Sequence, residues 1–254
     1  MPVLQEGLRG RVVFVTGAGQ GIGAALSRCL RADGALVAGC DLPEHLDEVA
    51  QVADLALACD VSDARQVEDA VARIVRRFGR IDGLLANAGI VRIGRLEDAP
   101  WDDLEKVVRV NLFGVMHCLR AVLPVMRAQN FGRIVAVTSR NAQLCKIGKS
   151  GYNASKAALV SLIGTVAREL EGTDILANNL VPGPTATRMH TQPGARAPST
   201  SYPTLRLLLS LPAGAASGRT FLDGEEIHIL HPLGDALRSS LDDSITTLTS
   251  QETA

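Results

Sequence analysis

The stretch Thr16-Gly17-Ala18-Gly19-Gln20-Gly21-Ile22-Gly23 indicates how the chain begins to fold. It follows a short apolar run at 12–15, which predicts a buried strand, and it leads into a helical pattern at 21–32. Glycines at such a corner let the backbone turn tightly, and the amides that open the helix then face a bound phosphate. The spacing misses the G-x-G-x-x-G pattern because position 22 is Ile, so a corner without a ligand is the alternative. The position between strand and helix favours a dinucleotide site.

The alternation of short apolar runs and helical patterns continues along the chain. Further strands are expected at 36–41, 55–59, 83–86, 134–137 and 175–181, and further helices at 63–78, 101–126 and 151–170. Pro124 is expected to bend or break the helix at 101–126. Continuous apolar strands that alternate with helices indicate an α/β fold, a doubly wound parallel sheet with helices on both faces. No linker or repeat interrupts the pattern, so we expect a single domain.

The chain changes character after Gly183. Residues 184–203 carry four prolines among small and polar residues, and they predict a loop. The only helical run of this region is 205–209, and an apolar segment at 219–230 is expected to form an edge strand. The last residues, 239–254, are polar and are expected to fray.

Composition excludes several classes of function. The chain has 254 residues, 46% of them hydrophobic and 21% charged, which is ordinary for a folded globular protein. The 26 basic and 27 acidic residues nearly cancel, so no strong field attracts nucleic acid or an anionic membrane surface. Aromatic residues make up 3% of the chain, which argues against a platform for stacking bases. Neither nucleic acid nor a membrane is an expected partner.

The patterns of cysteine and histidine indicate reduced thiols and no metal site. Five scattered cysteines form no CxxC pair, and the five histidines form no ligand-spaced group. The N-terminal residues contain no apolar signal-peptide region. The longest uncharged stretch, 175–187, is shorter than the about 20 residues of a membrane span. We therefore expect a soluble, unexported protein of the cytoplasm.

Asp41 stands at the end of the second expected strand, where a ribose would follow the phosphates. A carboxylate there can accept hydrogen bonds from both ribose hydroxyls, and it repels a 2′-phosphate. No Arg or Lys stands at 40, 42 or 43 to attract that phosphate. The alternative role is a helix N-cap, because Asp41 precedes Pro43. Asp41 favours NAD over NADP as the dinucleotide.

Tyr152 and Lys156 share one face of the helix expected at 151–170, because they stand four residues apart. A nearby ammonium lowers the pKa of a phenol, so the pair can supply a tyrosinate that takes a proton from an alcohol. Such pairs are common on helices, and taken alone this one is better explained as ordinary helix surface.

A set of motifs, taken in order, closely resembles the short-chain dehydrogenase/reductase family over residues 8–188. The set comprises residues 16–23, Asp60, Asn87-Ala88-Gly89, Asn111, Ser139, Tyr152-x-x-x-Lys156 and Pro182-Gly183. The resemblance implies a single Rossmann-type domain over 1–254. Within it, 8–188 would be the cofactor-binding and catalytic core, 189–218 the substrate lid region and 239–254 a polar tail.

The resemblance also implies roles for residues by their position. Catalytic roles are implied for Asn111, Ser139, Tyr152 and Lys156. NAD binding is implied for Gly17, Gln20, Gly21, Ile22, Gly23, Asp41, Asp60, Val61, Asn87, Ala88, Gly89, Tyr152, Lys156, Pro182, Gly183, Thr185 and Thr187. Substrate contacts are implied for Ser139, Asn141, Cys145, Tyr152 and His190. In this scheme Tyr152 moves the proton, Ser139 holds the reacting oxygen, and Asn111 holds a water that extends the relay from Lys156.

The activity implied by the resemblance is the NAD(H)-dependent interconversion of a secondary alcohol and a ketone, both small molecules. The helices expected at 101–126 and 151–170 match those that such proteins pair across subunits, which implies a homodimer or homotetramer. Two alternatives stay open. One is an NADPH-dependent biosynthetic ketoreductase, and the other is a non-catalytic NAD-binding scaffold on the same fold.

The sequence departs from the family pattern near its end. Leu222-Asp223-Gly224-Glu225-Glu226 replaces the usual Asp-Gly-Gly finish of the last strand. The segment between Gly183 and that strand also looks short. The departure concerns the substrate lid and one subunit contact, and it leaves the catalytic set unchanged.

The loop between Ser139 and Tyr152 leaves the substrate class open, because it carries both cations and apolar residues. The cations are Arg140, Lys146 and Lys149, and the apolar residues are Leu144, Cys145 and Ile147. The cations favour an anionic substrate, whereas the apolar residues fit a neutral, hydrophobic alcohol equally well.

Overall fold

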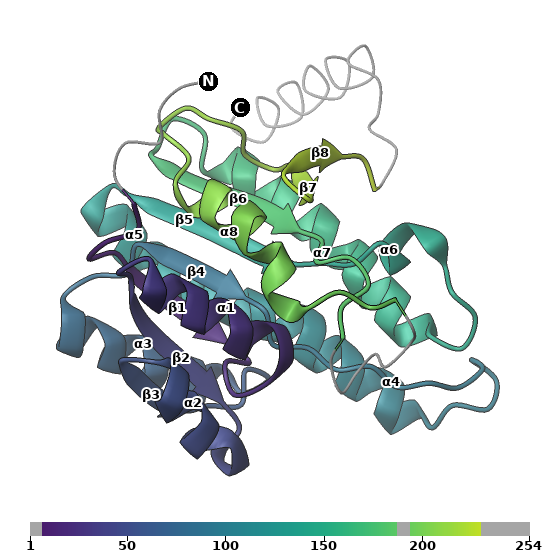
Figure 1. Cartoon of the computed structure of the whole chain (residues 1–254). Helices are drawn as coiled ribbons and strands as arrows, with labels where there is room; N and C mark the ends of the chain where they lie inside the picture. The colour runs from purple at the N-terminus through teal and green to yellow at the C-terminus, as the bar shows by residue number, and fades with distance from the viewer. Residues whose placement is uncertain (1–6, 187–193, 230–254) are drawn as a thin grey trace, which may run out of the picture.

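The computed structural model describes residues 7–186 and 194–229, and this part of the chain forms one sheet flanked by helices (Figure 1). The eight strands of the described part lie in the order β3-β2-β1-β4-β5-β6-β7-β8. They are β1 Val12–Thr16, β2 Leu36–Asp41, β3 Leu55–Ala58, β4 Gly83–Ala86, β5 Gly132–Val137, β6 Ile175–Leu180, β7 Thr220–Leu222 and β8 Glu225–Ile227. All neighbours pair in parallel except β7 and β8, which are antiparallel. The expected parallel sheet is confirmed.

Helices cover both faces of this sheet, as the alternating pattern predicted. They are α1 Gly21–Ala32, α2 Leu46–Val52, α3 Ala64–Phe78, α4 Trp101–Val108, α5 Gly114–Gln129, α6 Asn141–Leu144, α7 Ser150–Glu169 and α8 Tyr202–Leu209. One apolar core joins the sheet to α3, α5 and α7, and a second joins it to α1, α2 and α8. Two single 3₁₀ turns, Pro43–His45 and Pro198–Ser201, precede α2 and α8.

Of the two expectations for Pro124, a bend or a break of the long helix, the break is wrong. The helix runs through Pro124 to Gln129, since Val122 and Met126 are fully buried on either side of the proline and hold both halves against the core. The irregularity lies earlier, in a π-helical turn at Arg109–Phe113. By length and composition, Trp101–Gln129 is also apolar enough to cross a membrane, with mean hydropathy 1.3. That is weak evidence, because a core helix of a soluble protein passes the same test.

The apolar segment near the C-terminus forms two short strands instead of the single expected edge strand. Its turn is the dipeptide Asp223-Gly224, with φ of +53° and +84°, which is the geometry that a two-residue hairpin needs. β7 continues the parallel sheet beside β6, and β8 folds back as the antiparallel edge. The polar tail 239–254 lies outside the described residues.

The sheet brings the sequence motifs together at one edge. The chain leaves the carboxyl ends of β1, β4, β5 and β6 at Thr16, Ala86, Val137 and Leu180. The glycine-rich turn, Asn87-Ala88-Gly89, Ser139 and Pro182-Gly183 follow these four ends within two residues. The strands β1 and β4 are neighbours although a long stretch of chain separates them. In open α/β sheets, ligands bind outside the carboxyl ends of the strands at such a change of strand order. The fold therefore positions the candidate site there.

Candidate active site

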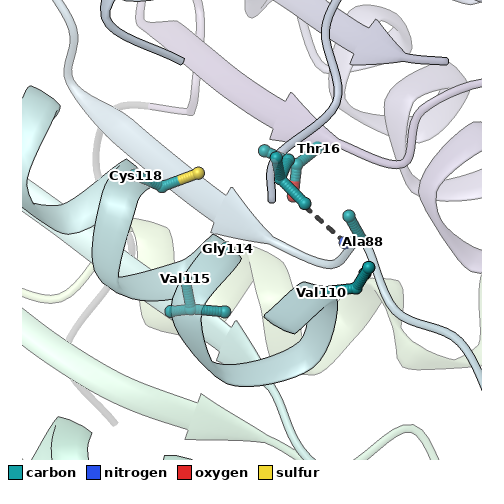
Figure 2. Close-up of a pocket in the computed structure, with 7 residues that line it drawn as sticks. Thr16, Ala88, Val110, Gly114, Val115 and Cys118 are labelled. Carbon is teal, nitrogen blue, oxygen red and sulfur yellow. Dashed lines mark hydrogen bonds between the residues drawn. The ribbon is translucent and has the colours of Figure 1, made fainter. Parts of the chain in front are cut away.

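The glycine-rich turn after β1 is fastened to the segment after β4. The backbone amides of Asn87 and Ala88 each donate to Thr16 Oγ1 at 3.0 Å, and Asn87 Nδ2 donates to the Thr16 carbonyl at 2.9 Å. Figure 2 shows the hydrogen bond between Thr16 and Ala88. A Cβ at Gly23 would overlap the carbonyl oxygen of Gly17, so only glycine allows α1 to start this close to the turn. Asn87-Ala88-Gly89 and the turn form one unit.

A shallow hollow lies between this unit and the helix that runs from the π-helical turn into α5 (Figure 2). It is lined by Thr16, Val61, Ala88, Val110, Gly114, Val115 and Cys118. The Val61 carbonyl lies 2.9 Å from His117 Nδ1, and a Cβ at Gly114 would press on the Val61 side chain. Beside Val61, Asp60 Oδ1 accepts from the Ser62 amide at 2.9 Å and from its hydroxyl at 2.8 Å. Val61, one of the residues with an implied NAD-binding role, thus borders the glycine-rich unit, and Asp60 precedes it in the chain.

Asp41 holds the end of β2 against the same turn. Its Oδ2 accepts from the Gly19 amide at 2.9 Å, and its Oδ1 accepts from the Leu42 amide at 2.9 Å. The alternative role as a helix cap is wrong, because Leu42 occupies the N-cap position before Pro43 and the 3₁₀ turn has no side-chain cap. The carboxylate instead lies at the turn, as a ribose-binding group requires.

His45 is a site residue that the sequence reasoning missed. The Gln20 side-chain amide lies 2.9 Å from His45 Nδ1, and a Cβ on Gly19 would meet both the His45 Cβ and the Asp41 carboxylate. The 3₁₀ turn that begins at Pro43 brings the imidazole back over the glycine-rich turn. A search for basic residues one helical turn after Asp41, and for His as well as Arg and Lys, would have found it.

Asn111 joins the segment after β4 to α7. Its Oδ1 accepts from the Ile90 amide at 2.8 Å, and its Nδ2 donates to the Ile90 carbonyl at 3.0 Å and to Ser155 Oγ at 3.1 Å. The side chain is fully buried in the π-helical turn, a distortion that is frequent at functional sites. Gly89 lies between Asn111 and Lys156, since a Cβ there would be 3.2 Å from Asn111 Oδ1 and 3.7 Å from Lys156 Nζ. These predicted residues are close in space.

Lys156 is 4% exposed, although lysine is rarely buried. Its Nζ donates to the Val137 carbonyl at 2.7 Å and lies 5.8 Å from the centre of the Tyr152 ring. Burial lowers the pKa of Lys156 to about 8, because the charged ammonium has lost its water. A buried amine with such a pKa can exchange a proton near neutral pH.

Tyr152 and Ser139 face each other from α7 and from the end of β5. Burial raises the pKa of Tyr152 above its usual value, and a hydrogen bond with Ser139 opposes this shift. The expectation that the Lys156 ammonium lowers the pKa of Tyr152 is not met in this structure, since burial dominates. Ser139 Oγ also accepts from the Asn141 amide at 3.1 Å, which fixes the hydroxyl at the start of α6.

The Pro182-Gly183 turn lies beyond the end of β6. The Pro182 carbonyl accepts from Thr185 Oγ1 at 3.1 Å, from Ser201 Oγ at 3.3 Å and from Arg196 Nη2 at 3.3 Å. Gly183 has φ +69°, a conformation that favours glycine. Arg196 is the second residue that the sequence reasoning missed, because it stands in a loop without periodicity.

The remaining substrate candidates are only partly described. Asn141 opens α6, and Cys145 ends it as an exposed residue with φ +48°. Thr187 and His190 lie outside the described residues. Within 7–186 and 194–229, no three His, Cys, Asp or Glu side chains gather into a group that could hold a metal ion.

Comparison with known proteins identifies the relatives of this chain. Residues 11–197 match the short chain dehydrogenase family. The 3-oxoacyl-(acyl-carrier-protein) reductase FabG of Thermotoga maritima is 36% identical over 183 residues, which cover 69% of this chain and 74% of that protein. The 2,3-dihydro-2,3-dihydroxybenzoate dehydrogenase of Escherichia coli is 36% identical over 180 residues, 71% of either chain.

Solved structures of other proteins also resemble this fold. The 3-ketoacyl-(acyl-carrier-protein) reductase of Brucella melitensis, complexed with NADH, superposes with a TM-score of 0.78 at 27% identity, over 84% of this chain and 96% of that one. A short chain dehydrogenase of Burkholderia cenocepacia, in complex with NADP, gives 0.78 at 28% identity over 86% and 98%. The two neighbours hold different forms of the nicotinamide cofactor, so the likeness leaves the choice between them open.

Proposed function

The chain belongs to the short-chain dehydrogenase/reductase family, and from that premise we propose that it interconverts a secondary alcohol and a ketone with NAD(H). The observation that carries the proposal is the buried Lys156, which lies beside Tyr152, with Ser139 and Asn111 at the same edge of the sheet. A buried lysine needs a reason, because desolvation penalises its charge. Proton exchange with Tyr152 is that reason.

The glycine-rich turn fits a dinucleotide. Gly17 and Gly21 have φ of +67° and +52°. The absence of a side chain at Gly23 lets α1 start against the turn. α1 begins without a side-chain cap at Gln20 and without an acidic residue in its first turn. Its first amides are therefore suited to the phosphates, while Asp41 would take the ribose.

The chemistry divides between the cofactor and the protein. NAD, when bound, supplies the hydride acceptor. In alcohol oxidation Tyr152 removes the hydroxyl proton, Ser139 hydrogen-bonds the reacting oxygen, and Lys156 exchanges a proton with the Tyr152 hydroxyl. The pKa of Tyr152 is raised by burial in the structure, and the Ser139 hydrogen bond opposes that shift and so favours ionisation of the phenol. Proton transfer of this kind contributes about 10²–10⁴-fold to the rate.

NAD is the preferred cofactor in this proposal, because the Asp41 carboxylate repels a 2′-phosphate. One observation favours the alternative, an NADPH-dependent biosynthetic ketoreductase. His45 lies over the same turn, and an imidazole N–H there can donate a hydrogen bond to a 2′-phosphate. The non-catalytic scaffold is the weaker alternative, since a scaffold has no need of a buried lysine beside a tyrosine.

We further propose a homodimer or homotetramer in the cytoplasm. Trp101 and Phe113 lie on the long helix with exposed aromatic side chains, which supports a subunit contact there. The substrate is proposed to be a small, neutral alcohol or ketone, because Leu144 and Ile147 beside α6 are 52% and 86% exposed and would be covered by an apolar ligand.

A panel of chiral secondary alcohols with NAD⁺, followed by the absorbance of NADH, tests the proposal. The expected result is turnover of one enantiomer of a pair, because a fixed Ser139 and Tyr152 admit only one orientation of the carbinol. The matching ketones with NADH and NADPH complete the panel. Binding of ADP-ribose without turnover of any alcohol or ketone would instead favour the scaffold.

A further inference from the structure

Arg196 lies beside the Pro182-Gly183 turn because the chain returns to it. The Arg196 amide donates to the Pro184 carbonyl at 2.8 Å, and the Arg196 carbonyl accepts from the Ala186 amide at 2.8 Å. These bonds form a parallel bridge between Thr185 and Arg196. Residues 184–186, which follow the turn, are thereby paired with Arg196. This pairing brings the arginine side chain close to Gly183.

The Arg196 guanidinium joins two parts of the fold that are distant in sequence. Its Nη2 donates to the Pro182 carbonyl at 3.3 Å, and its Nη1 donates to Asp223 Oδ2 at 2.9 Å. Nη2 also lies 2.9 Å from Asp223 Oδ1, so both nitrogens meet the carboxylate. A fork of two such bonds fixes the orientation of both groups, which a lysine could not do. The absence of a side chain at Gly183 leaves room for the guanidinium.

Asp223 is itself held in place by the hairpin. It occupies the turn between β7 and β8 with φ +53°, and β7 pairs with β6, the strand that leads into Pro182. The ion pair therefore closes a ring from β6 through the Pro182-Gly183 turn to Arg196, Asp223 and β7.

We propose that Arg196, oriented by Asp223, is a positioning residue for the nicotinamide end of the cofactor. The inference rests on the proposed function, with the Pro182-Gly183 turn at the nicotinamide end of the cofactor, as the family resemblance implies. Arg196 holds the Pro182 carbonyl and lies against Gly183, so its loss frees the turn to take other conformations. The ion pair is 35% exposed at Arg196 and 50% exposed at Asp223, and exposed pairs contribute little to global stability. We therefore expect loss of the ion pair to change the conformation of the Pro182-Gly183 turn more than the stability of the whole protein.

The test compares the binding of NADH with the binding of ADP-ribose, which lacks the nicotinamide. Arg196→Ala is expected to weaken NADH binding roughly five- to tenfold, the lower part of the range for coupled sites, and to leave ADP-ribose binding within about twofold. Asp223→Ala should have the same selectivity. The double variant should be no worse than Arg196→Ala alone, since the two residues act as a unit. Arg196→Lys should recover only part of the loss.

Arg219 and Glu226 provide a matched control on the same hairpin. They form an ion pair at 3.4 Å with exposed fractions of 46% and 39%, similar to the Arg196 pair. Arg219→Ala should leave the binding of both ligands unchanged, with thermal stability close to that of Arg196→Ala. Equal losses of NADH and ADP-ribose binding in Arg196→Ala, or no loss of either, would overturn the proposal. A wild-type protein that bound neither ligand would instead contradict the proposed function, and the positioning role with it.

Discussion

Lys156 Nζ donates a hydrogen bond to the carbonyl oxygen of Val137 at 2.7 Å, so the last residue of β5 holds the ammonium beneath the Tyr152 ring. Both residues belong to elements of the core, and neither depends on a mobile loop. The amine that we propose as part of the catalytic set is thus positioned by the sheet itself. This position buries the charged ammonium of Lys156, which lowers its pKa. Because the pKa of Lys156 then differs between the folded and unfolded states, the stability of the protein depends on pH.

Stability is predicted to rise as the pH increases from about 8 to about 10. The pKa of Lys156 is lowered to about 8 in the folded protein, while an unfolded lysine titrates near 10.4, so the unfolded state binds more protons in this window. Urea unfolding of the wild type and of Lys156→Met at several pH values measures the effect. The wild type should gain stability relative to the variant between pH 8 and 10, and parallel curves would show that Lys156 keeps its usual pKa.

Asp41→Ala is predicted to reduce or reverse the preference for NAD over NADP. The substitution removes the carboxylate that repels a 2′-phosphate, and it leaves the His45 imidazole over the turn. The ratio of kcat/KM for the two cofactors is the measurement. His45→Ala in the Asp41→Ala background is the control, and it should lower the kcat/KM for NADP because the imidazole N–H donor is lost. A wild-type preference for NADP would show that the ribose contact is misplaced.

Asn111→Leu is predicted to destabilise the protein by about 1–3 kcal/mol, because it leaves the half-buried amide and carbonyl of Ile90 without their side-chain partners. Chemical denaturation measures the loss. Asn130→Gly is a suitable control, since Asn130 has φ +48° at the exposed end of α5, where glycine is at least as favourable. A loss below about 0.5 kcal/mol in Asn111→Leu would mean that the amide does not link α7 to the segment after β4.

A neutral alcohol is predicted to be a better substrate than a matched alcohol with a carboxylate, at both low and high salt. Leu144 and Ile147 present apolar surface beside α6, whereas Arg140 and Lys146 are exposed and can remain solvated. The measurement is kcat/KM for each pair of alcohols. A preference for the carboxylate that weakens with added salt would show that the cations guide the substrate.

Much of the fold follows from the sequence because its central strands, β1, β4, β5 and β6, are short, mostly apolar and buried along their length. The helix at 21–32 and the strand at 83–86 were predicted with the bounds that the structure has, since glycine and polar residues delimit them. The hairpin at Asp223-Gly224 was missed, although its dipeptide is a turn signal, because each of its strands has only three residues. Pro124 misled the prediction, since packing of α5 on both sides of the proline outweighs one missing hydrogen bond.

The candidate site was predicted as a set of residues but not as a set of contacts. The motifs place Asp41, Tyr152 and Lys156 at the correct edge of the sheet. The sequence contains no sign that burial would raise the pKa of Tyr152, because burial depends on the packing of α7. Arg196 and His45 reach the site through a loop bridge and a 3₁₀ turn, which have no periodic pattern to reveal them.

Tyr152→Phe tests the central claim most directly, because it removes the phenolic hydroxyl and keeps the ring. Turnover of an alcohol accepted by the wild type should fall by about 10²–10⁴-fold, while NADH binding, measured by titration, should change by less than about threefold. Ser161→Ala, an exposed position on the same helix, is the control and should retain wild-type turnover. A Tyr152→Phe variant that keeps the turnover of the wild type would contradict the assignment of Tyr152 as the proton-transfer residue and, with it, the proposed reaction.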